Sequence, residues 1–313
     1  MRIGLDVMGG DFAPSATIKG AVLALRELPE DTRLVLYGDQ TLIKAALAEE
    51  NTSSDSFDIV HAPDTIGMGE HPTKAFLKRP TSSISVAFHH LKQGLIDGLA
   101  SAGNSGAMLV GAFYTIKSIL GVIRPSLTSI LPKEQGGVGL LLDVGINADC
   151  KPDVLNQFAI LGSLYAEHVY GIKNPKVALL NIGEEAGKGN LLSQSAYNLM
   201  SESEEFNFVG NIEGRDLFNE RADVIVCDGF TGNIVLKQAE AFYELTRKRG
   251  LKDSYFDRFN YENYGGTPIL GVNGTVVIGH GISNDIAIKN MVLHTDEVIT
   301  AKLSEKIKQA FQE

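Results

Sequence analysis

The stretch Val177-Ala-Leu-Leu-Asn-Ile-Gly-Glu-Glu-Ala-Gly-Lys-Gly189 shows how this chain folds. It opens with a short run of Val, Ala and Leu, which is typical of a strand buried on both faces of a sheet. A glycine-bearing loop that contains Lys188 follows the strand and leads into a helical pattern. The start of a helix presents unpaired N–H groups and a partial positive charge, so this arrangement favours binding of an anion such as phosphate.

Three more loops in the second half of the chain close an apolar strand and open a helix in the same way. They are Gly210-Asn-Ile-Glu-Gly-Arg-Asp216, Cys227-Asp-Gly-Phe-Thr-Gly-Asn233 and Gly279-His-Gly-Ile-Ser283. Ligands of open α/β sheets bind outside the carboxyl ends of the strands, which is where these loops fall. We therefore expect the loops to converge on a phosphate site that carries Lys188, Asn233 and His280.

Strand and helix patterns alternate along the whole chain. Asp39 and Ser82 are suitable N-caps for the helical patterns that follow them. The alternation predicts an α/β fold with a mostly parallel sheet and helices on both faces. We expect one domain over residues 1–313, in which the irregular segment 66–81 is a candidate lid. The expected strands are Ile3–Val7, Arg33–Tyr37, Asp58–Ala62, Leu99–Ala102, Leu127–Leu131, Val138–Asp143, Val177–Ile182, Val224–Cys227 and Thr275–Ile278.

Composition excludes several classes of protein. The formal net charge of −10 argues against non-specific binding to nucleic acid, which needs a basic face. Cys150 and Cys227 form neither a disulfide framework nor a metal-ligand pattern, which favours the cytoplasm and no metal or cofactor. The most apolar stretch, Met108 to Ile123, is broken by Lys117 and is too short to span a bilayer.

The motif Leu5-Asp-Val-Met-Gly-Gly-Asp-Phe-Ala-Pro14 follows a strand near the start of the chain. Gly9 and Gly10 let the backbone turn tightly and approach a ligand. Asp6 and Asp11 can orient a loop, a substrate hydroxyl or a cation, and they also fit simple turn caps.

The motif Ser101-Ala-Gly-Asn-Ser-Gly-Ala107 resembles a nucleophile elbow, but Ala107 stands where that motif has glycine. No His and acid complete a triad in the expected order. We therefore expect the hydroxyl of Ser105 and the N–H groups around it to bind phosphate.

Two other loops resemble nucleotide-binding motifs only in part. Gly183-Glu-Glu-Ala-Gly-Lys-Gly189 has its glycines one residue too close for a P-loop, and Gly189 replaces the magnesium-binding Ser or Thr. Gly279-His-Gly281 lacks the third glycine of a dinucleotide fingerprint. These departures favour simple anion binding by Lys188 over binding of a nucleotide.

Taken together, the motifs resemble those of the PlsX family, the acyl-[acyl carrier protein]:phosphate acyltransferases of bacterial phospholipid synthesis. The resemblance runs nearly from end to end of the chain, and the order of the short matching segments makes it specific. These segments are Asp6-Val-Met-Gly-Gly-Asp11 with Pro14, Ser101–Ala107, Arg124-Pro125, Leu142-Asp-Val-Gly145 with Asn147, Asn181–Glu185 with Lys188-Gly189, Gly210–Asp216, Asp228–Asn233, Tyr264-Gly-Gly266 and His280-Gly281.

The resemblance implies a three-layer α/β/α sandwich like that of isocitrate and isopropylmalate dehydrogenases, usually as a homodimer. It implies transfer of a fatty acyl group from acyl carrier protein to inorganic phosphate, without a cofactor. The acyl phosphate then serves a membrane glycerol-3-phosphate acyltransferase. Phosphate itself attacks the thioester in this reaction, which fits the lack of a protein nucleophile.

We assign site residues on the combined basis of the loops and the resemblance. The expected catalytic residues are Lys188, Asn233 and His280. The expected phosphate-binding residues are Asn104, Ser105, Gly106, Thr231 and Gly232. The expected supporting residues are Asp6, Gly9, Gly10, Asp11, Glu184, Glu185, Arg215 and Asp228. Glu184 and Glu185 are expected to orient Lys188 and the neighbouring loops.

The helical excursion at 234–262 is shorter than the PlsX family usually has. It includes Arg247-Lys-Arg249 among apolar and aromatic residues, a pattern that suits a membrane surface, for peripheral contact, or an acidic carrier protein. Three alternatives to the carrier-protein reaction remain. One is a phosphate acyltransferase that uses acyl-coenzyme A, of the acetyl or butyryl type. The others are an NAD-dependent decarboxylating dehydrogenase and a non-catalytic phosphate-sensing or carrier-binding module.

Overall fold

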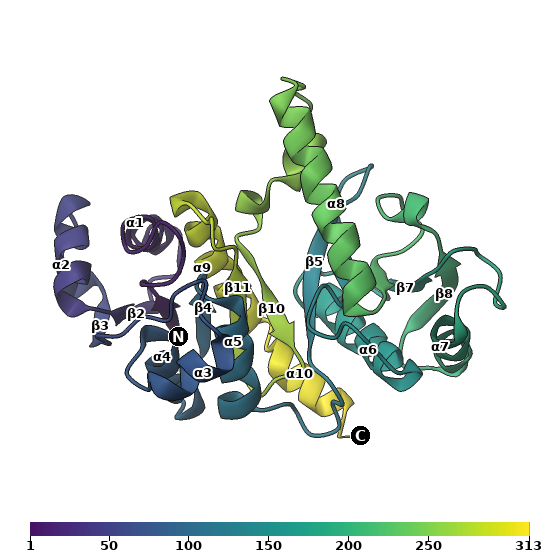
Figure 1. The fold of residues 1–313 in the computed structure, drawn as a ribbon, viewed down its shortest axis with the longest axis horizontal. Coiled ribbons are helices and arrows are strands. Elements are labelled where there is room, and N and C mark those ends of the chain that lie inside the picture. The colour runs from purple at the N-terminus through teal and green to yellow at the C-terminus, as the bar shows by residue number, and fades with distance from the viewer. Residues whose placement is uncertain (313) are drawn as a thin grey trace. The chain divides into compact units, whose positions relative to one another are not determined.

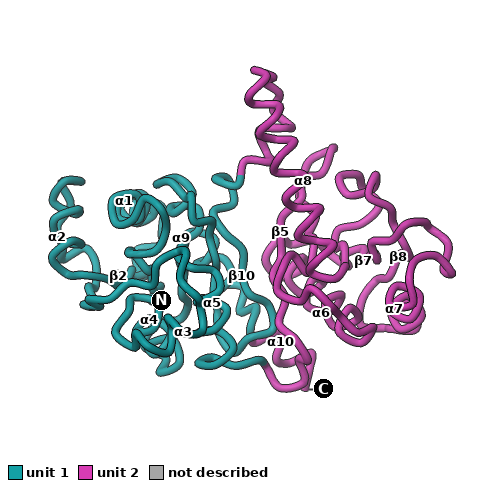
Figure 2. The backbone as a smooth tube through the Cα atoms, in the orientation of Figure 1, with its two compact units in different colours: residues 1–118, 261–304 teal, residues 119–260, 305–313 magenta. Residues whose placement is uncertain are grey.

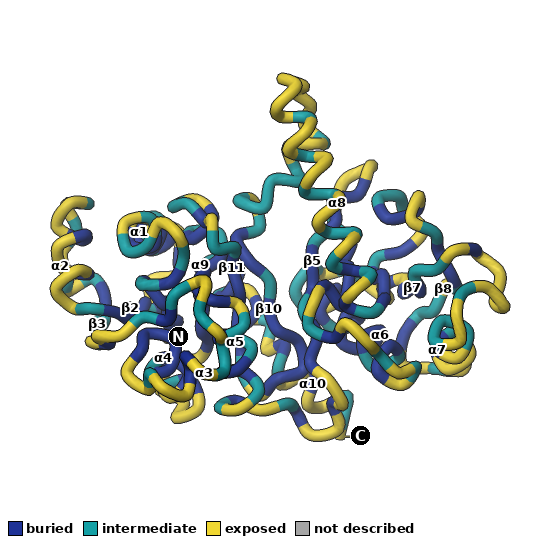
Figure 3. Tube along the Cα trace, viewed as in Figure 1, coloured by how far each residue is buried: buried dark blue, intermediate teal, exposed yellow. Residues whose placement is uncertain are grey.

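The computed structural model describes residues 1–312, which divide into two compact units (Figure 2). Unit 1 comprises Met1–Ser118 and Tyr261–Ser304, and unit 2 comprises Ile119–Asn260 and the residues from Glu305 on. In each unit the strands are largely buried, and exposed residues gather in loops and on the outer sides of helices (Figure 3). Each unit therefore has its own set of buried strands and its own apolar core.

The sheet of unit 1 is parallel except at one edge. Its strands lie in the order β3-β2-β1-β4-β11-β10. All neighbours run parallel except β10, which is antiparallel to β11. The bounds are β1 (Arg2–Asp6), β2 (Arg33–Gly38), β3 (Asp58–His61), β4 (Gly98–Ser101), β10 (Gly266–Leu270) and β11 (Thr275–Gly279).

Helices cover both faces of this sheet (Figure 1). On one face, Ile3 and Leu36 pack in a buried core with Ile18 of α1 and Ile288 of α9. Side chains alternate along a strand, so Tyr37 points to the other face, where its hydroxyl lies 2.9 Å from Nδ1 of His90 in α4. The helices are α1 (Ser15–Leu25), α2 (Gln40–Glu49), α3 (Pro72–Lys78), α4 (Ser83–Lys92), α5 (Ser105–Gly111) with a π-helical turn (Ala112–Ile116), and α9 (Asp285–Thr300).

The sheet of unit 2 follows the same plan, with strands in the order β5-β6-β9-β7-β8. Among these strands, only β5 runs antiparallel to β6, and the other pairs are parallel. Leu236 of α8 packs on the face that carries Ile225, and Gly162 of α6 lies against Leu142 on the opposite face. The strands are β5 (Ser126–Pro132), β6 (Val138–Leu142), β7 (Lys176–Leu180), β8 (Asn207–Ile212) and β9 (Val224–Val226). The α-helices are α6 (Pro152–His168), α7 (Leu191–Glu202) and α8 (Gly229–Lys248), and α10 (Leu303–Ala310) follows α9 in the chain.

The expected α/β class, with mostly parallel strands between helical layers, is confirmed, and each expected strand is present. The expected caps are confirmed as well, since Asp39 accepts two N–H bonds at the start of α2 and Ser82 accepts one at the start of α4. Two strands of the structure, β8 and β10, were not expected from the sequence. β8 carries Asn207, Gly210 and Asn211, and β10 contains Pro268, so neither shows the apolar run of a central strand.

Three local expectations need correction or refinement. The loop expected from Gly210 begins inside β8, and only a short 3₁₀ turn, η3 (Gly214–Asp216), follows it instead of an α-helix. Segment 66–81 contains α3 in addition to irregular chain. Segment 234–262 is mostly α8, followed by the 3₁₀ turns η4 (Phe256–Phe259) and η5 (Tyr261–Asn263). The single phosphate acyltransferase domain and the lid stay predictions.

The close packing of α1 on α9 generates a test of the unit 1 core. A Cβ atom at Gly20 would lie 2.5 Å from Cβ of Ile288 and 2.7 Å from the backbone oxygen of Asp285. We expect Gly20→Val to lower the free energy of unfolding by about 1–3 kcal/mol, because overpacking forces neighbouring groups apart. Urea denaturation measures this loss. Gly69→Val is the matched control, since a Cβ there meets nothing within 4 Å; an equal loss in both variants would contradict the packing argument.

Candidate active site

Several expected site residues of unit 1 meet at the carboxyl edge of its sheet. Asp6 ends β1, Ser101 ends β4 and His280 follows β11, and these strands run parallel. Asp6 is buried and accepts hydrogen bonds from the Ser101 hydroxyl (2.7 Å) and the Met8 N–H (3.1 Å). Burial raises the pKa of the Asp6 carboxyl. Asp6 therefore holds the loop after β1 in place and is not open to a ligand.

The loop after β1 approaches the loops after β4 and β11 closely. A Cβ at Gly9 would lie 2.7 Å from the backbone of Gly103. The loops after β1 and β4 can therefore approach this closely only because residue 9 is a glycine. Gly10 has φ of +106°, a conformation that glycine adopts freely. The N–H of Asp11 donates to the carbonyl of Gly281 over 2.8 Å, and the Asp11 side chain is exposed. The expected supporting role of this loop thus has a geometric basis.

Asn104 holds a neighbouring segment of the chain. Its Nδ2 lies 3.0, 3.2 and 3.1 Å from the carbonyl oxygens of Gly67, Met68 and Glu70. Its Oδ1 accepts the Ala107 N–H and so caps α5. The Asn104 side chain, which we expected to bind phosphate, is therefore already engaged.

The two residues after Asn104 differ in exposure. Ser105 is exposed at the start of α5, so its hydroxyl is open to a ligand. Gly106 packs against the start of α3, where a Cβ atom would lie 2.7 Å from Cγ of Pro72. Gly106 thus permits a close approach of two helices.

His280 lies against an aromatic ring that the sequence did not indicate. The rings of His280 and Tyr261 are 4.9 Å apart between centroids and inclined by 49°. The Tyr261 hydroxyl donates to the carbonyl of Ile282 over 3.0 Å, which ties the tyrosine to the His280 loop. Tyr261 and His280 are far apart in sequence and share no motif, so no sequence pattern could have paired them.

In unit 2, hydrogen-bond donors at the start of α8 are bonded within the first turn of the helix. Asp228 caps the helix, accepting the Thr231 N–H (2.8 Å) and the Thr231 hydroxyl (3.0 Å) on its two carboxylate oxygens. The Gly232 N–H donates to the carbonyl of Asp228 over 3.0 Å. These three donors, expected to bind phosphate, are thus bonded within the turn. Asn233 is half-buried, and its Nδ2 donates to the carbonyl of Val144 over 3.3 Å.

Asp143 fixes the loop on which Asn233 rests. It is fully buried, and its carboxylate accepts N–H bonds from Leu127 (3.0 Å), Val144 (2.9 Å) and Asn147 (2.5 Å). Burial raises the pKa of this carboxyl. From the sequence, Asp143 was expected at the end of a strand and within a segment of the family resemblance, but it was given no role. An acid directly after a buried strand was the signal that could have found it.

Glycine lets α8 pack against the Asp143 loop. A Cβ at Gly232 would lie 2.0 Å from the backbone oxygen of Asp143, and one at Gly229 would lie 2.6 Å from its carboxylate. Neither clash could be relieved by a side-chain rotation, because the Asp143 carboxylate is held by several bonds and the other atom is backbone. The glycines of this motif therefore serve packing.

Lys188 lies in a folded but accessible loop between β7 and α7. Its side chain is 51% exposed, and its Nζ is 3.9 Å from Oε2 of Glu185, the pairing that we expected. Its N–H donates to the carbonyl of Glu185 over 3.0 Å, and its carbonyl accepts a bond from Nδ2 of Asn181. The next residue, Gly189, has φ of +88°. Among residues 1–312, the turn thus presents a lysine whose charge is offset by one loose contact, with Glu185.

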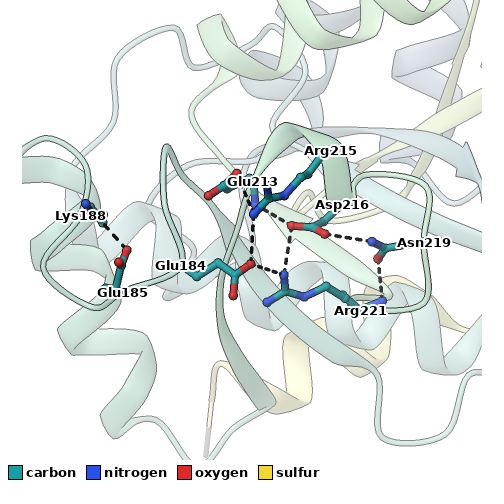
Figure 4. A network of polar contacts seen from close by, with 8 residues as sticks. All are labelled: Glu184, Glu185, Lys188, Glu213, Arg215, Asp216, Asn219 and Arg221. Carbon is teal, nitrogen blue, oxygen red and sulfur yellow. Dashed lines mark hydrogen bonds and ion pairs between the residues drawn. The ribbon is translucent and has the colours of Figure 1, made fainter.

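Glu184 pairs with arginines (Figure 4). Its Oε1 is 2.7 Å from Nη1 of Arg221 and 3.5 Å from Nη2 of Arg215. The Arg221 guanidinium lowers the pKa of the Glu184 carboxyl. Arg215, expected as a supporting residue, is mostly exposed, whereas Arg221 was not expected at all. Arg221 lies outside the recognised motifs, so its partner could be found only in three dimensions.

Within residues 1–312, no group of three or more His, Cys, Asp and Glu side chains is placed to hold a metal ion. Over the same residues, no helix combines the length and apolar character needed to cross a bilayer.

Comparison with known proteins decides the family. The model of the family described as "Fatty acid synthesis protein" matches residues 1–306. A phosphate acyltransferase from Dictyoglomus turgidum is 40% identical, with 98% of this chain and 96% of the relative covered. One from Heliobacterium modesticaldum is 45% identical, with 93% and 91% covered. The chain belongs to this phosphate acyltransferase family. The recognised resemblance and the expected acyltransferase class are therefore confirmed, as is the place of the family in lipid biosynthesis.

Solved structures show the same fold at low sequence identity. A phosphotransacetylase from Staphylococcus aureus has a TM-score of 0.64 at 18% identity, with 96% of this chain and 94% of that chain covered. A branched-chain phosphotransacylase from Enterococcus faecalis has a TM-score of 0.64 at 14% identity, with 96% and 99% covered. At such identities the likeness concerns the fold alone.

The contacts of Asn104 generate a test of the unit 1 loops. We expect Asn104→Ala to speed amide hydrogen exchange in residues 67–70, because the bonds that hold three of their carbonyls are lost. Loss of the α5 cap adds a destabilisation of about 0.5–2 kcal/mol. Asn190→Ala, which removes only the cap of α7, is the control. Unchanged exchange at 67–70 in Asn104→Ala would show that this side chain does not hold the segment.

Proposed function

We propose that this protein transfers a fatty acyl group from the thioester of an acyl carrier protein to inorganic phosphate. The products are acyl phosphate and the free carrier protein. Membership of the phosphate acyltransferase family over almost the whole chain is the observation that carries the proposal. The family description, a fatty acid synthesis protein, favours a long acyl chain and a carrier-protein donor.

The chemistry requires no nucleophile from the protein. A phosphate oxygen attacks the thioester carbonyl carbon, a C–O bond forms, and the C–S bond breaks as the electron pair leaves on sulfur. The sulfur then takes a proton to give the carrier-protein thiol. The protein has to hold the anion, stabilise the tetrahedral oxyanion and assist departure of the thiolate.

Lys188 is the best-placed side chain to hold phosphate. Its side chain is half exposed, and Glu185 offsets its charge only from 3.9 Å. The Ser105 hydroxyl, exposed at the start of α5, is the second group that we assign to phosphate. The backbone donors of Thr231 and Gly232 are bonded to Asp228, so we give them a structural role.

We assign stabilisation of the oxyanion to Asn233 and proton donation to the leaving sulfur to His280. The Asn233 amide keeps only one long bond, of 3.3 Å to the carbonyl of Val144, so it can turn an N–H toward the oxyanion. His280, whose ring rests on Tyr261, can give a proton toward sulfur. A free thiol has a pKa of about 8.5, so the thiolate leaves without strong assistance.

The far end of α8 supports an acidic partner. Arg247, Lys248, Arg249 and Lys252 are exposed there beside the exposed Leu245. The chain as a whole carries −10, so this is a local concentration of positive charge. We propose it as a contact for the carrier protein, with peripheral membrane contact as the competing use. A homodimer in the cytoplasm and consumption of acyl phosphate by a membrane glycerol-3-phosphate acyltransferase complete the proposal.

The first test measures acyl phosphate, trapped with hydroxylamine, from long-chain acyl carrier protein with and without phosphate. We expect phosphate-dependent product, and we expect Lys188→Ala to raise KM for phosphate by about 10–100-fold, because a charge-assisted contact is lost. Lys44→Ala, at an exposed lysine of α2, is the control. Product only from acyl-coenzyme A would select the acetyl- or butyryl-type alternative. No product from either donor would refute the proposal.

The second test separates the roles of Asn233 and His280. We expect Asn233→Ala to lower kcat by about 10²–10³-fold, as loss of one oxyanion donor does. We expect His280→Ala to lower kcat less, because the thiolate is already a good leaving group. Both rates are measured at saturating phosphate and acyl donor. A larger loss in His280→Ala than in Asn233→Ala would mean that proton transfer, and not charge stabilisation, limits the reaction.

A further inference from the structure

Asn211, the second-to-last residue of β8, is a buried polar residue with an unusual hydrogen-bond pattern. Its side chain is nearly inaccessible, at 2% exposure, and its Nδ2 donates to the carbonyl of Glu185 over 3.0 Å. Its Oδ1 has no partner among the described residues. A buried acceptor without a partner costs free energy, whereas an apolar residue at this position would avoid that cost. The useful property of Asn211 is therefore the one bond that it makes.

That bond leads directly to Lys188. The carbonyl oxygen of Glu185 accepts two bonds, one from Nδ2 of Asn211 and one from the backbone N–H of Lys188, both over 3.0 Å. Asn211 thus holds the atom that also fixes the backbone of the phosphate-site lysine. Because β8 is part of the sheet, this contact ties an exposed turn to the rigid part of unit 2.

A second side chain holds the preceding residue from outside the turn (Figure 4). Nη1 of Arg221 lies 2.7 Å from Oε1 of Glu184 and 3.2 Å from Oδ2 of Asp216. Asp216 is buried and is itself held by the Glu213 N–H (3.1 Å) and the Asn219 amide (2.9 Å). Nη1 of Arg221 is therefore bonded to the buried Asp216 and pairs with Glu184 at the same time.

We infer that Asn211 and Arg221 are positioning residues that hold residues 183–189 in the conformation that presents Lys188 to phosphate. Asn211, in β8, bonds to Glu185, and Arg221, in the turn before β9, pairs with the adjacent Glu184. Neither residue needs to touch the substrate. The inference rests on the proposed role of Lys188. It adds two residues that set the affinity for phosphate by holding the loop of Lys188, without contacting phosphate themselves.

The decisive experiment varies phosphate at saturating acyl donor in Asn211→Asp and Arg221→Ala. Asn211→Asp keeps the shape of the side chain but removes the N–H donor. We expect KM for phosphate to rise about tenfold in each variant while KM for the acyl donor is unchanged, because a displaced binding group loses much of its effect. Arg221→Lys should restore part of the loss, since it keeps a cation beside Glu184.

Hydrogen exchange gives a readout that does not depend on activity. We expect faster exchange of the amides of residues 183–189 in both variants, including Arg221→Ala, whose exposed site makes it the variant less prone to misfold. Asn207→Ala is the matched control for Asn211, because it removes an amide-to-carbonyl bond from the same strand. Arg2→Ala removes a comparable exposed ion pair from unit 1 and is the control for Arg221.

Lys188→Ala distinguishes failure of this inference from failure of the proposed function. Combined with Lys188→Ala, the two substitutions should raise KM for phosphate no further, since both act through that lysine. If Lys188→Ala raises KM for phosphate and the variants at 211 and 221 do not, the inference is overturned and the proposed function stands. If these variants lower only thermal stability, they are structural and the inference again fails. If Lys188→Ala leaves KM for phosphate unchanged, the role of Lys188 fails, and the inference fails with it.

Discussion

The buried carboxylate of Asp143 is the constraint on which the position of the start of α8 in unit 2 depends. Three backbone N–H groups donate to it, so the loop after β6 has little freedom. The start of α8 then packs so closely on this loop that only glycine fits at positions 229 and 232. Asn233, one residue further, takes its place from that contact. A buried charge therefore determines where a half-exposed amide can act.

The same principle recurs on the other loops. Asp6 in unit 1 is a buried carboxylate that fixes the loop after its strand, and it leaves the exposed Asp11 at a defined distance from the loop after β11. The turn that carries Lys188 is bonded from outside by amide and guanidinium groups: Asn211 donates to the carbonyl of Glu185, and Arg221 pairs with Glu184. In each case the candidate substrate-contacting residues are exposed or half-buried, and the residues that position them are buried or bonded to buried groups. This division lets a parallel sheet present accessible chemistry without a flexible framework.

The sequence predicted the parts of the fold that depend on apolar runs and missed those that do not. β8 and β10 escaped because their asparagines, glycine and proline conceal the strand pattern, and these strands were recognisable only through their neighbours in the sheet. The motifs located Lys188, Asn233 and His280 at strand ends, but they could not show which donors were already used. Thr231 and Asn104 looked like phosphate ligands until their partners were visible. Tyr261 and Arg221 act through contacts with residues distant in sequence, and a single chain carries no local signal for such pairs. Asp143 did have a local signal, its place directly after a buried strand, and that signal was not used.

The amide of Asn104 has a consequence for the segment that it holds. A primary amide has two hydrogens, yet three carbonyl oxygens, of Gly67, Met68 and Glu70, lie within bonding distance of its nitrogen. At any moment, therefore, at least one of the three carbonyls shares a hydrogen with another carbonyl or makes no hydrogen bond to this amide. The segment 67–70 is thus locally frustrated, with several bonding patterns of similar energy around one fixed nitrogen. An exchange of partners among these carbonyls leaves the start of α5 capped, because that cap uses Oδ1 of Asn104 and not its nitrogen.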